Sequence, residues 1–263
     1  MTARDQRRGV AGAVERHPLV TFFALAFPLS WAIVPFTGPD AINPTGPFLA
    51  ALIVSSVLAG RRGVGAWLRR SFTPRGRWHW YAAAVGIVLG LNVLALLLAL
   101  LLGAAEPSGD DLGAWPEALI VFPFYLVLIA AMEESGWRGF AMPRLTERWG
   151  VLGATTVLGV LVAVWHLPLV VGGSQAAVIL GAVFASQFLF TWLQAKTGGS
   201  VPVVMVAHAS QGGLAGAYIG PMLSGTDETL ELSLLTALLG LVAGTVAWSW
   251  TRGRAPEAPP VPQ

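Results

Sequence analysis

The feature that most constrains this chain is a series of apolar segments, each long enough to cross a lipid bilayer. A membrane-spanning helix needs about 20 mostly apolar residues, and such segments fill most of the 263-residue chain. The sequence therefore predicts an all-α fold, a polytopic transmembrane bundle of about eight helices. The candidate spans are residues 18–37, 44–60, 79–103, 116–143, 152–171, 176–194, 201–220 and 231–250.

Composition agrees with this fold class. The chain is 55% hydrophobic and 11% charged, whereas a soluble domain carries about 25% charged residues. The absence of cysteine excludes a disulfide framework and a thiolate metal site. A net charge of +2 is too small to favour nucleic acid as a partner. We expect the lipid bilayer itself to be the main partner.

The basic residues predict how the chain is oriented in the membrane. Cytoplasmic segments of membrane proteins are enriched in Lys and Arg. With the N-terminus inside, every outer loop lacks both residue types, and both termini are cytoplasmic. The basic residues that then lie inside are Arg4, Arg7, Arg8, Arg16, Arg61, Arg62, Arg69, Arg70, Arg75, Arg77, Arg144, Arg148, Lys196, Arg252 and Arg254.

The chain is predicted to form one membrane domain with two short ends. Residues 18–250 hold all the spans, and residues 1–17 form a cytoplasmic N-terminal segment. The first apolar run, from Leu19, has no small-residue cleavage site, so we interpret it as a retained helix rather than a signal peptide. Residues 251–263 are a Pro-rich cytoplasmic tail whose composition is typical of disorder.

Three charged residues lie inside the fourth span. Glu133, Glu134 and Arg138 would each cost several kcal/mol if they faced lipid, so such residues usually face the bundle interior. Glu134 and Arg138 are four residues apart and share one helix face, whereas Glu133 points about 100° away. We expect the arginine to neutralise Glu134 and leave Glu133 free to handle protons. The alternative is an ion pair that only locks helices together, but a second glutamate then has no structural use.

Two histidines lie inside later apolar spans. A lone buried histidine is more often a packed core residue than a functional one, but His166 and His208 accompany an intramembrane glutamate pair, which favours function. If Trp149 marks the turn between two antiparallel helices, Glu133 and His166 lie at nearly equal depth.

Carboxylates and imidazoles together can activate water by general base catalysis. They can also bind one divalent metal ion such as zinc, with water at an open position. In that case the metal ligands are Glu134, His166 and His208. The chain has no H-E-x-x-H motif, so the usual zinc-protease helix is absent.

At these residues the chain resembles the CPBP family of intramembrane proteases (CAAX prenyl protease and bacteriocin-processing, also called Abi). That family shows E-E-x-x-x-R, then F-x-x-x-H, then H-x-x-x-N or D, on three membrane helices in this order. The first motif is complete here in Glu133, Glu134 and Arg138. The second and third motifs keep their histidines, His166 and His208.

Two positions depart from the family pattern. Val162 stands where Phe is usual, and Gly212 stands where Asn is usual. Ser210 and Gln211 are the candidate substitutes for the missing Asn, although Gln211 lies about 100° off that helix face. From the sequence we expect Gly212→Asn to raise activity or leave it unchanged.

The resemblance implies an intramembrane endopeptidase that hydrolyses peptide bonds in membrane-associated peptides or protein tails. It implies a multi-pass protein of the bacterial cell membrane. By matching position, Glu133 is the general base and His166 helps to activate the water. Glu134 and Arg138 orient this pair, and His208 stabilises the oxyanion or binds metal. The resemblance leaves open whether the enzyme is a metalloprotease or a glutamate-type protease.

Two other functions are compatible with the sequence. Departures at Val162 and Gly212 favour a catalytically weak member that acts as a binding or bacteriocin-immunity module. Intramembrane Glu and His also build proton relays, which is typical of a proton-coupled transporter. Transporters often contain internal repeats, and no second E-E-x-x-x-R-like half exists in this chain.

Overall fold

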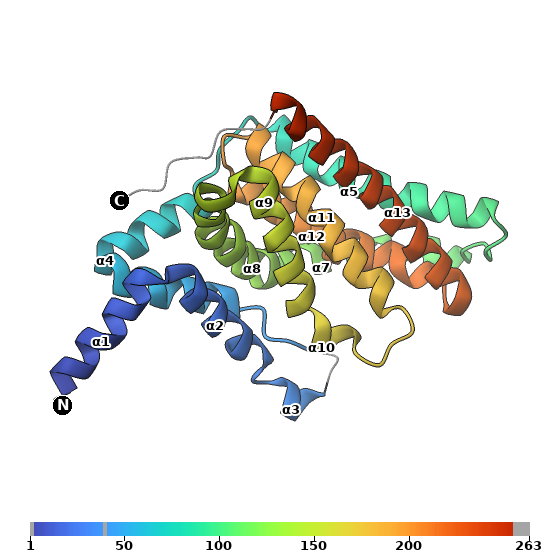
Figure 1. The fold of residues 1–263 in the computed structure, drawn as a ribbon. Helices are drawn as coiled ribbons and strands as arrows, with labels where there is room; N and C mark the ends of the chain where they lie inside the picture. Colours follow the sequence, from blue (N-terminus) through green and yellow to red (C-terminus); the bar gives the residue numbers. More distant parts are fainter. Residues whose placement is uncertain (1–2, 39–40, 255–263) are drawn as a thin grey trace.

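The structure is a computed structural model that describes residues 3–38 and 41–254. Within these ranges the chain is built of helices and turns without a strand (Figure 1). Residues 255–263, which make up most of the Pro-rich tail, lie outside the described residues. The expected disorder of the tail therefore stays a prediction.

Most elements are α-helices, whereas η1, η2, η3 and η5 are π-helical and η4 is a 3₁₀ turn. The elements are α1 (Ala3–Arg16), α2 (Pro18–Trp31), α3 (Val34–Thr37), α4 (Gly46–Phe72), α5 (His79–Leu101), α6 (Gly109–Gly113), α7 (Trp115–Phe124), η1 (Tyr125–Ala130), α8 (Ala131–Gly136), η2 (Trp137–Ala141), α9 (Met142–Trp165), α10 (Leu167–Val170), α11 (Ala176–Lys196), α12 (Val201–Ala209), η3 (Ser210–Ile219), η4 (Gly220–Met222), α13 (Gly225–Ser249) and η5 (Trp250–Arg254).

Six helical stretches of the described chain are long and apolar enough to cross a membrane, which confirms the all-α membrane fold class. They are Pro18–Thr37, Gly46–Phe72, His79–Leu101, Trp115–Trp165, Ala176–Lys196 and Gly225–Gly253. The expected fourth span and most of the expected fifth span lie in the Trp115–Trp165 stretch. The expected span 201–220 is helical too, but His208 and Gln211 make it less apolar. Eight crossings and cytoplasmic termini stay predictions.

Gly150 divides the longest of these stretches. Its φ of +65° is a left-handed conformation that glycine adopts without steric cost. The expected turn at Trp149 is adjacent to this break. In Figure 1 the chain changes direction between the green α8 and the lower, yellow-green part of α9. This change turns the second part of α9, which ends at Trp165 next to His166, back along the bundle.

Helix α4 is longer than the sequence predicted. The expected span ended at residue 60 and was followed by a loop, but α4 continues to Phe72 after an interruption at Ala59 and Gly60, where Gly60 has φ +55°. The arginines after Gly60 lower the apolar content, which is why the span seemed to end there. The prediction missed that apolar residues continue on one face: Trp67 is buried, and Val64 and Leu68 pack against the main core.

The glutamate-bearing segment lies between neighbours that approach it closely. Helix α8 packs against α4 and α12, and α11 packs against α9 and α13. A side chain at Gly136 would lie within 2.6 Å of the Pro47 carbonyl of α4, so glycine is required for this contact. Small residues in this motif therefore permit close helix packing, as they commonly do in membranes.

Candidate active site

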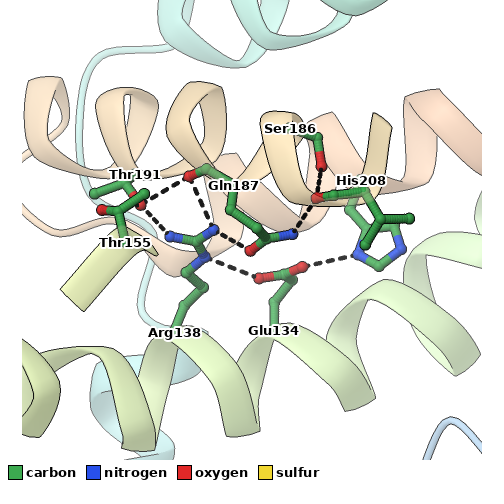
Figure 2. Close-up of polar contacts among 8 residues, drawn as sticks. Glu134, Arg138, Thr155, Ser186, Gln187, Thr191 and His208 are labelled. Carbon is green, nitrogen blue, oxygen red and sulfur yellow. Dashed lines mark hydrogen bonds and ion pairs between the residues drawn. The ribbon is translucent and has the colours of Figure 1, made fainter. Parts of the chain in front are cut away.

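Glu134 joins the charged residues of the fourth span to the histidine of α12 (Figure 2). Its Oε1 accepts a hydrogen bond from His208 Nδ1 at 2.8 Å. Its Oε2 lies 3.4 Å from Arg138 Nε, at the i,i+4 spacing that the sequence predicted. The carboxylate is 2% exposed. Both oxygens thus face a cationic or hydrogen-donating group, which is what a buried carboxylate requires.

Arg138 is fully buried, and side chains of α11 hold its guanidinium. Its Nη1 donates to Thr191 Oγ1 at 2.5 Å, and its Nη2 donates to Gln187 Oε1 at 2.5 Å. Thr155 of α9 in turn donates to Thr191 at 3.2 Å. The planar guanidinium therefore contacts a carboxylate, an amide and a hydroxyl at once, a geometry that lysine cannot reproduce.

Sequence reasoning missed the residues of α11 that hold Arg138. Gln187 and Thr191 lie in an otherwise apolar span, where a polar side chain commonly hydrogen-bonds to another helix. Their polarity could have predicted a hydrogen bond to another helix. The partner was not predictable, because it depends on how α11 packs beside η2.

His208 is oriented for chemistry at its second ring nitrogen. Because a carboxylate accepts the hydrogen bond from Nδ1, this nitrogen carries a proton. The ring also stacks on Phe190, with the centroids 6.0 Å apart and the planes at 24°. Nε2 hydrogen-bonds to no residue of the described chain. It can therefore serve a substrate or water.

His166 is fixed in the same way by a backbone group. Its Nδ1 is 2.8 Å from the Val162 carbonyl, which can only accept, so Nδ1 donates and Nε2 of the neutral ring has a free lone pair. The ring also packs edge-on against Trp165, at 4.9 Å between centroids. The backbone of Val162 supplies this contact. The missing Phe side chain at that position is therefore not needed to orient the histidine.

Electrostatics tie His166 to the rest of the cluster. The charges of Glu134 and His208 both act on its ring, and the same two residues act on Glu133. No hydrogen bond or ion pair joins Glu133 to His166 among the described residues. Glu133 and His166 therefore both lie within electrostatic range of Glu134 and His208.

Glu133 differs from its neighbour in having no hydrogen-bond partner in the described chain. It is 4% exposed. One helical turn later, the ring of Trp137 packs edge-on against the ring of Trp165, with 5.7 Å between centroids. Trp165 in turn packs against the ring of His166. An apolar aromatic wall thus lies beside an unpaired carboxylate, and water is its natural partner.

Ser135 is not placed as a nucleophile. Its hydroxyl donates to the Met132 carbonyl at 3.0 Å, and its own carbonyl accepts from Trp67 Nε1 at 2.8 Å. No base contacts the hydroxyl among the described residues. An activated serine needs such a base within hydrogen-bonding distance.

The expectation that Gly212→Asn is tolerated or beneficial conflicts with the structure. A Cβ at Gly212 would lie 2.2 Å from Tyr125 Cε1 and 2.5 Å from Cδ1. At the adjacent Gly213, a Cβ would lie 2.9 Å from the Phe122 backbone. The ring of Tyr125 occupies the space that an asparagine would need. The sequence could not show this, because Tyr125 comes from a helix far away in the chain.

The two candidate substitutes for that asparagine are engaged elsewhere. Gln211 and Asn92 of α5 exchange two amide hydrogen bonds, at 3.0 and 3.2 Å. Ser210 donates to the Val206 carbonyl at 2.8 Å. Gln211 therefore links η3 to α5, and Ser210 bonds its own helix. Asn92 is a further buried polar residue in an apolar span that sequence reasoning did not single out.

The donors expected for a metal do not converge. Among the described residues, no group of three or more His, Cys, Asp or Glu side chains is arranged to hold a metal ion. Glu134 directs its oxygens to Arg138 and His208 rather than toward a common point. The arrangement present does not fit a metal, so the chemistry below is derived through protein groups.

π-helical segments surround these side chains. The α-helical turn with both glutamates, Ala131–Gly136, lies between the π-helical η1 and η2, and η3 begins two residues after His208. Single π-type turns in helices occur frequently at functional sites. Their concentration here is consistent with a functional role for the cluster.

The segment that holds the candidate active site is similar in sequence to a known family of endopeptidases. Residues 115–214, which contain both glutamates and both histidines, match the family described as Rce1-like, type II CAAX prenyl endopeptidase Rce1-like. The sequence is also 25% identical, over 130 residues, to CAAX prenyl protease 2 of Methanococcus maripaludis. That similarity covers 44% of this chain and 48% of the relative. The chain thus spans about half the length of the curated relative that it matches.

Proposed function

We propose that this chain, whose residues 115–214 belong to the Rce1-like CAAX prenyl endopeptidase family, is an intramembrane endopeptidase acting on membrane-associated peptides or protein tails. The observation that supports the proposal is that two adjacent carboxylates, Glu133 and Glu134, have different environments. Glu134 is neutralised and used to orient His208, whereas Glu133 is buried and unpaired.

In the proposed reaction Glu133 accepts a proton from water as the water oxygen attacks the peptide carbonyl. A positioned carboxylate acts as a general base in this way, typically contributing about 10²–10⁴-fold to the rate. His166 presents the free lone pair of Nε2 and holds the water. The proton on Glu133 is then passed to the nitrogen of the leaving amine, so no covalent enzyme intermediate is formed.

His208 is proposed to stabilise the oxyanion. Its Nδ1–H is held by the Glu134 carboxylate, whose charge favours a second proton on Nε2. The Nε2–H then donates to the developing negative charge. A preorganised donor of this kind contributes about 2.7–4 kcal/mol to transition-state stabilisation. Arg138 acts through Glu134 and is a positioning residue.

The proposed substrate class follows from the membrane location. A site on helices within a bilayer reaches peptides that are attached to or delivered by the membrane. Of the residues expected to bind a metal, Glu134 already has both oxygens engaged, by Arg138 and by His208. The proposal therefore concerns hydrolysis by a glutamate-activated water and makes no requirement for a prenyl group.

The test is cleavage of a library of lipid-tethered peptides by the purified protein in proteoliposomes. Wild type should cut a subset of the library, and Glu133→Gln should bind the same peptides without cutting them. Parallel assays with a chelator and with added zinc measure metal dependence directly. If wild type binds peptides but cuts none, the binding-module alternative replaces the endopeptidase. Proton flux without cleavage would favour a transporter.

A further inference from the structure

A basic pocket lies between α4 and the segment that follows the glutamate pair. Its walls include Leu58, Arg62, Trp67 and Arg70 of α4, together with Gly139 of η2 and Arg144 of α9. Gly139 lies one residue after Arg138 in the sequence. The pocket therefore adjoins the helix of the candidate active site, but none of the site's titratable residues lines it.

Arginines line this pocket from both of its sides. Arg144 donates to the Phe140 carbonyl at 2.8 Å, and its guanidinium stacks 3.9 Å above the Phe140 ring. The charge of Arg70 acts on that of Arg144, and both interact with Glu147. Arg62 is exposed and hydrogen-bonds to no described residue. Arg62 of α4 and Arg144 of α9 thus bring guanidiniums to the pocket from two helices.

The part of α4 that supplies these arginines is amphipathic. After the interruption at Gly60, four arginines fall in twelve residues, 61–72, beside the buried Trp67 and the packed Leu68. Phe72 at the end of the helix is 39% exposed. Basic and aromatic residues on one short helix are typical of a segment lying at the membrane surface.

We propose that this pocket binds the phosphate of an anionic phospholipid headgroup. Arginine is the side chain best matched to phosphate, because its planar fork donates two parallel hydrogen bonds. Basic pockets between membrane helices are recognised sites for anionic headgroups. Leu58 and the neighbouring apolar part of α4 lie beside the pocket, where the glycerol backbone and acyl chains would continue into the bilayer.

The occupant would bridge the two walls of the pocket. Trp67 already ties α4 to the Ser135 carbonyl at 2.8 Å, and Gly139 leaves room for Ser71 of α4, whose Oγ would lie 2.0 Å from a Cβ there. A phosphate held by Arg62 of α4 and Arg144 of α9 would add a third link. Binding should therefore stabilise the folded protein.

The test measures lipid binding directly and does not depend on proteolysis. The purified protein in neutral detergent is titrated with phosphatidylglycerol and, separately, with phosphatidylcholine, and its unfolding temperature is recorded. We expect stabilisation by phosphatidylglycerol only. Arg62→Gln and Arg144→Gln should each weaken its binding about 5-fold, from the known contribution of one basic residue near an anionic surface.

Arg61→Gln is the matched control, because it removes the same charge from the adjacent residue, which does not line the pocket. It should change the affinity less than 2-fold. If Arg144→Gln fails to fold because its contacts with Phe140 are lost, Arg62→Gln decides alone, since Arg62 makes no such contact. Equal weakening by Arg61→Gln and Arg62→Gln would overturn the pocket in favour of a diffuse surface charge.

Soluble glycerol 3-phosphate distinguishes the source of the phosphate. The proposal expects it to stabilise the protein only at concentrations far above those of the lipid. Equal stabilisation by both would overturn the lipid proposal and indicate a site for free phosphorylated solutes. Binding of peptide carboxylates with no binding of phosphatidylglycerol would also overturn it, and would indicate a substrate subsite.

Discussion

His208 Nδ1 lies 2.8 Å from Glu134 Oε1, across 74 positions of the sequence. This hydrogen bond joins the first and third motifs of the chain directly and sets the tautomer of the histidine. A carboxylate that orients an imidazole in this way commonly also stabilises its protonated form. The two motifs therefore form one unit, and changing either member should impair the other.

Glu134→Gln should reduce turnover by about 10²–10⁴-fold without abolishing peptide binding. The amide cannot accept from His208 and from Arg138 with both of its polar atoms, because one of them is a donor. The measurement is kcat and KM on a cleaved library peptide. Glu117→Gln, an exposed glutamate of α7, is the control. An unchanged kcat would show that the hydrogen bond has no catalytic use.

Arg138→Ala should lower both folded yield and activity. It removes the cationic partner of Glu134 Oε2 and the hydrogen-bond donor to Gln187 Oε1, and breaking a buried pair costs about 3–5 kcal/mol. Arg138→Lys should rescue only in part, because lysine cannot contact Glu134, Gln187 and Thr191 at once. Folded yield by size-exclusion chromatography and the thermal midpoint measure this. Exposed Arg148→Ala is the control, and normal yield for Arg138→Ala would contradict the prediction.

Gly212→Asn should destabilise the protein, contrary to the expectation from sequence alone. The new side chain would collide with Tyr125, and overpacking of this kind costs about 1–3 kcal/mol. Tyr125→Ala combined with Gly212→Asn should regain part of the loss, because the ring is removed. Thermal unfolding of the two single variants and the double variant tests this. Wild-type stability of Gly212→Asn alone would refute the steric explanation.

The predicted orientation can be tested cleanly because the chain has no native cysteine. Gly109→Cys and Thr226→Cys should react with an impermeant thiol reagent from outside intact cells. Thr73→Cys, in the segment with the inner arginines, should react only after the membrane is opened. Labelling of position 109 or 226 from the cytoplasm alone would contradict the topology.

Local spacing predicted part of the site. The pairing of Glu134 with Arg138 follows from four residues of helix, and the intramembrane histidines were conspicuous among apolar neighbours. The Gln187 and Asn92 contacts were not predictable in the same way. Each joins two helices whose relative rotation depends on packing along their whole length.

The fold, like the site, was predictable where a local stretch of sequence determines it and not where packing between distant segments does. Apolar runs predicted the membrane class and most helix starts, because hydropathy is a local property. The extension of α4 to Phe72 was missed, since its arginines ended the apolar run although Trp67 still packs inward. The position of Tyr125 against Gly212 was hidden for a related reason, because a glycine in a sequence does not identify which side chain fills the space beside it.

The central claim is that Glu133 activates the attacking water, and single-turnover cleavage by Glu133→Gln tests it most directly. The measurement compares rate constants of wild type and variant with enzyme in excess over a cleaved peptide. Glu231→Gln, a buried glutamate of α13, serves as the control. The account predicts that Glu133→Gln cleaves at least about 10²-fold more slowly, with peptide binding and the Glu231→Gln rate unchanged. A Glu133→Gln rate within tenfold of wild type would contradict it.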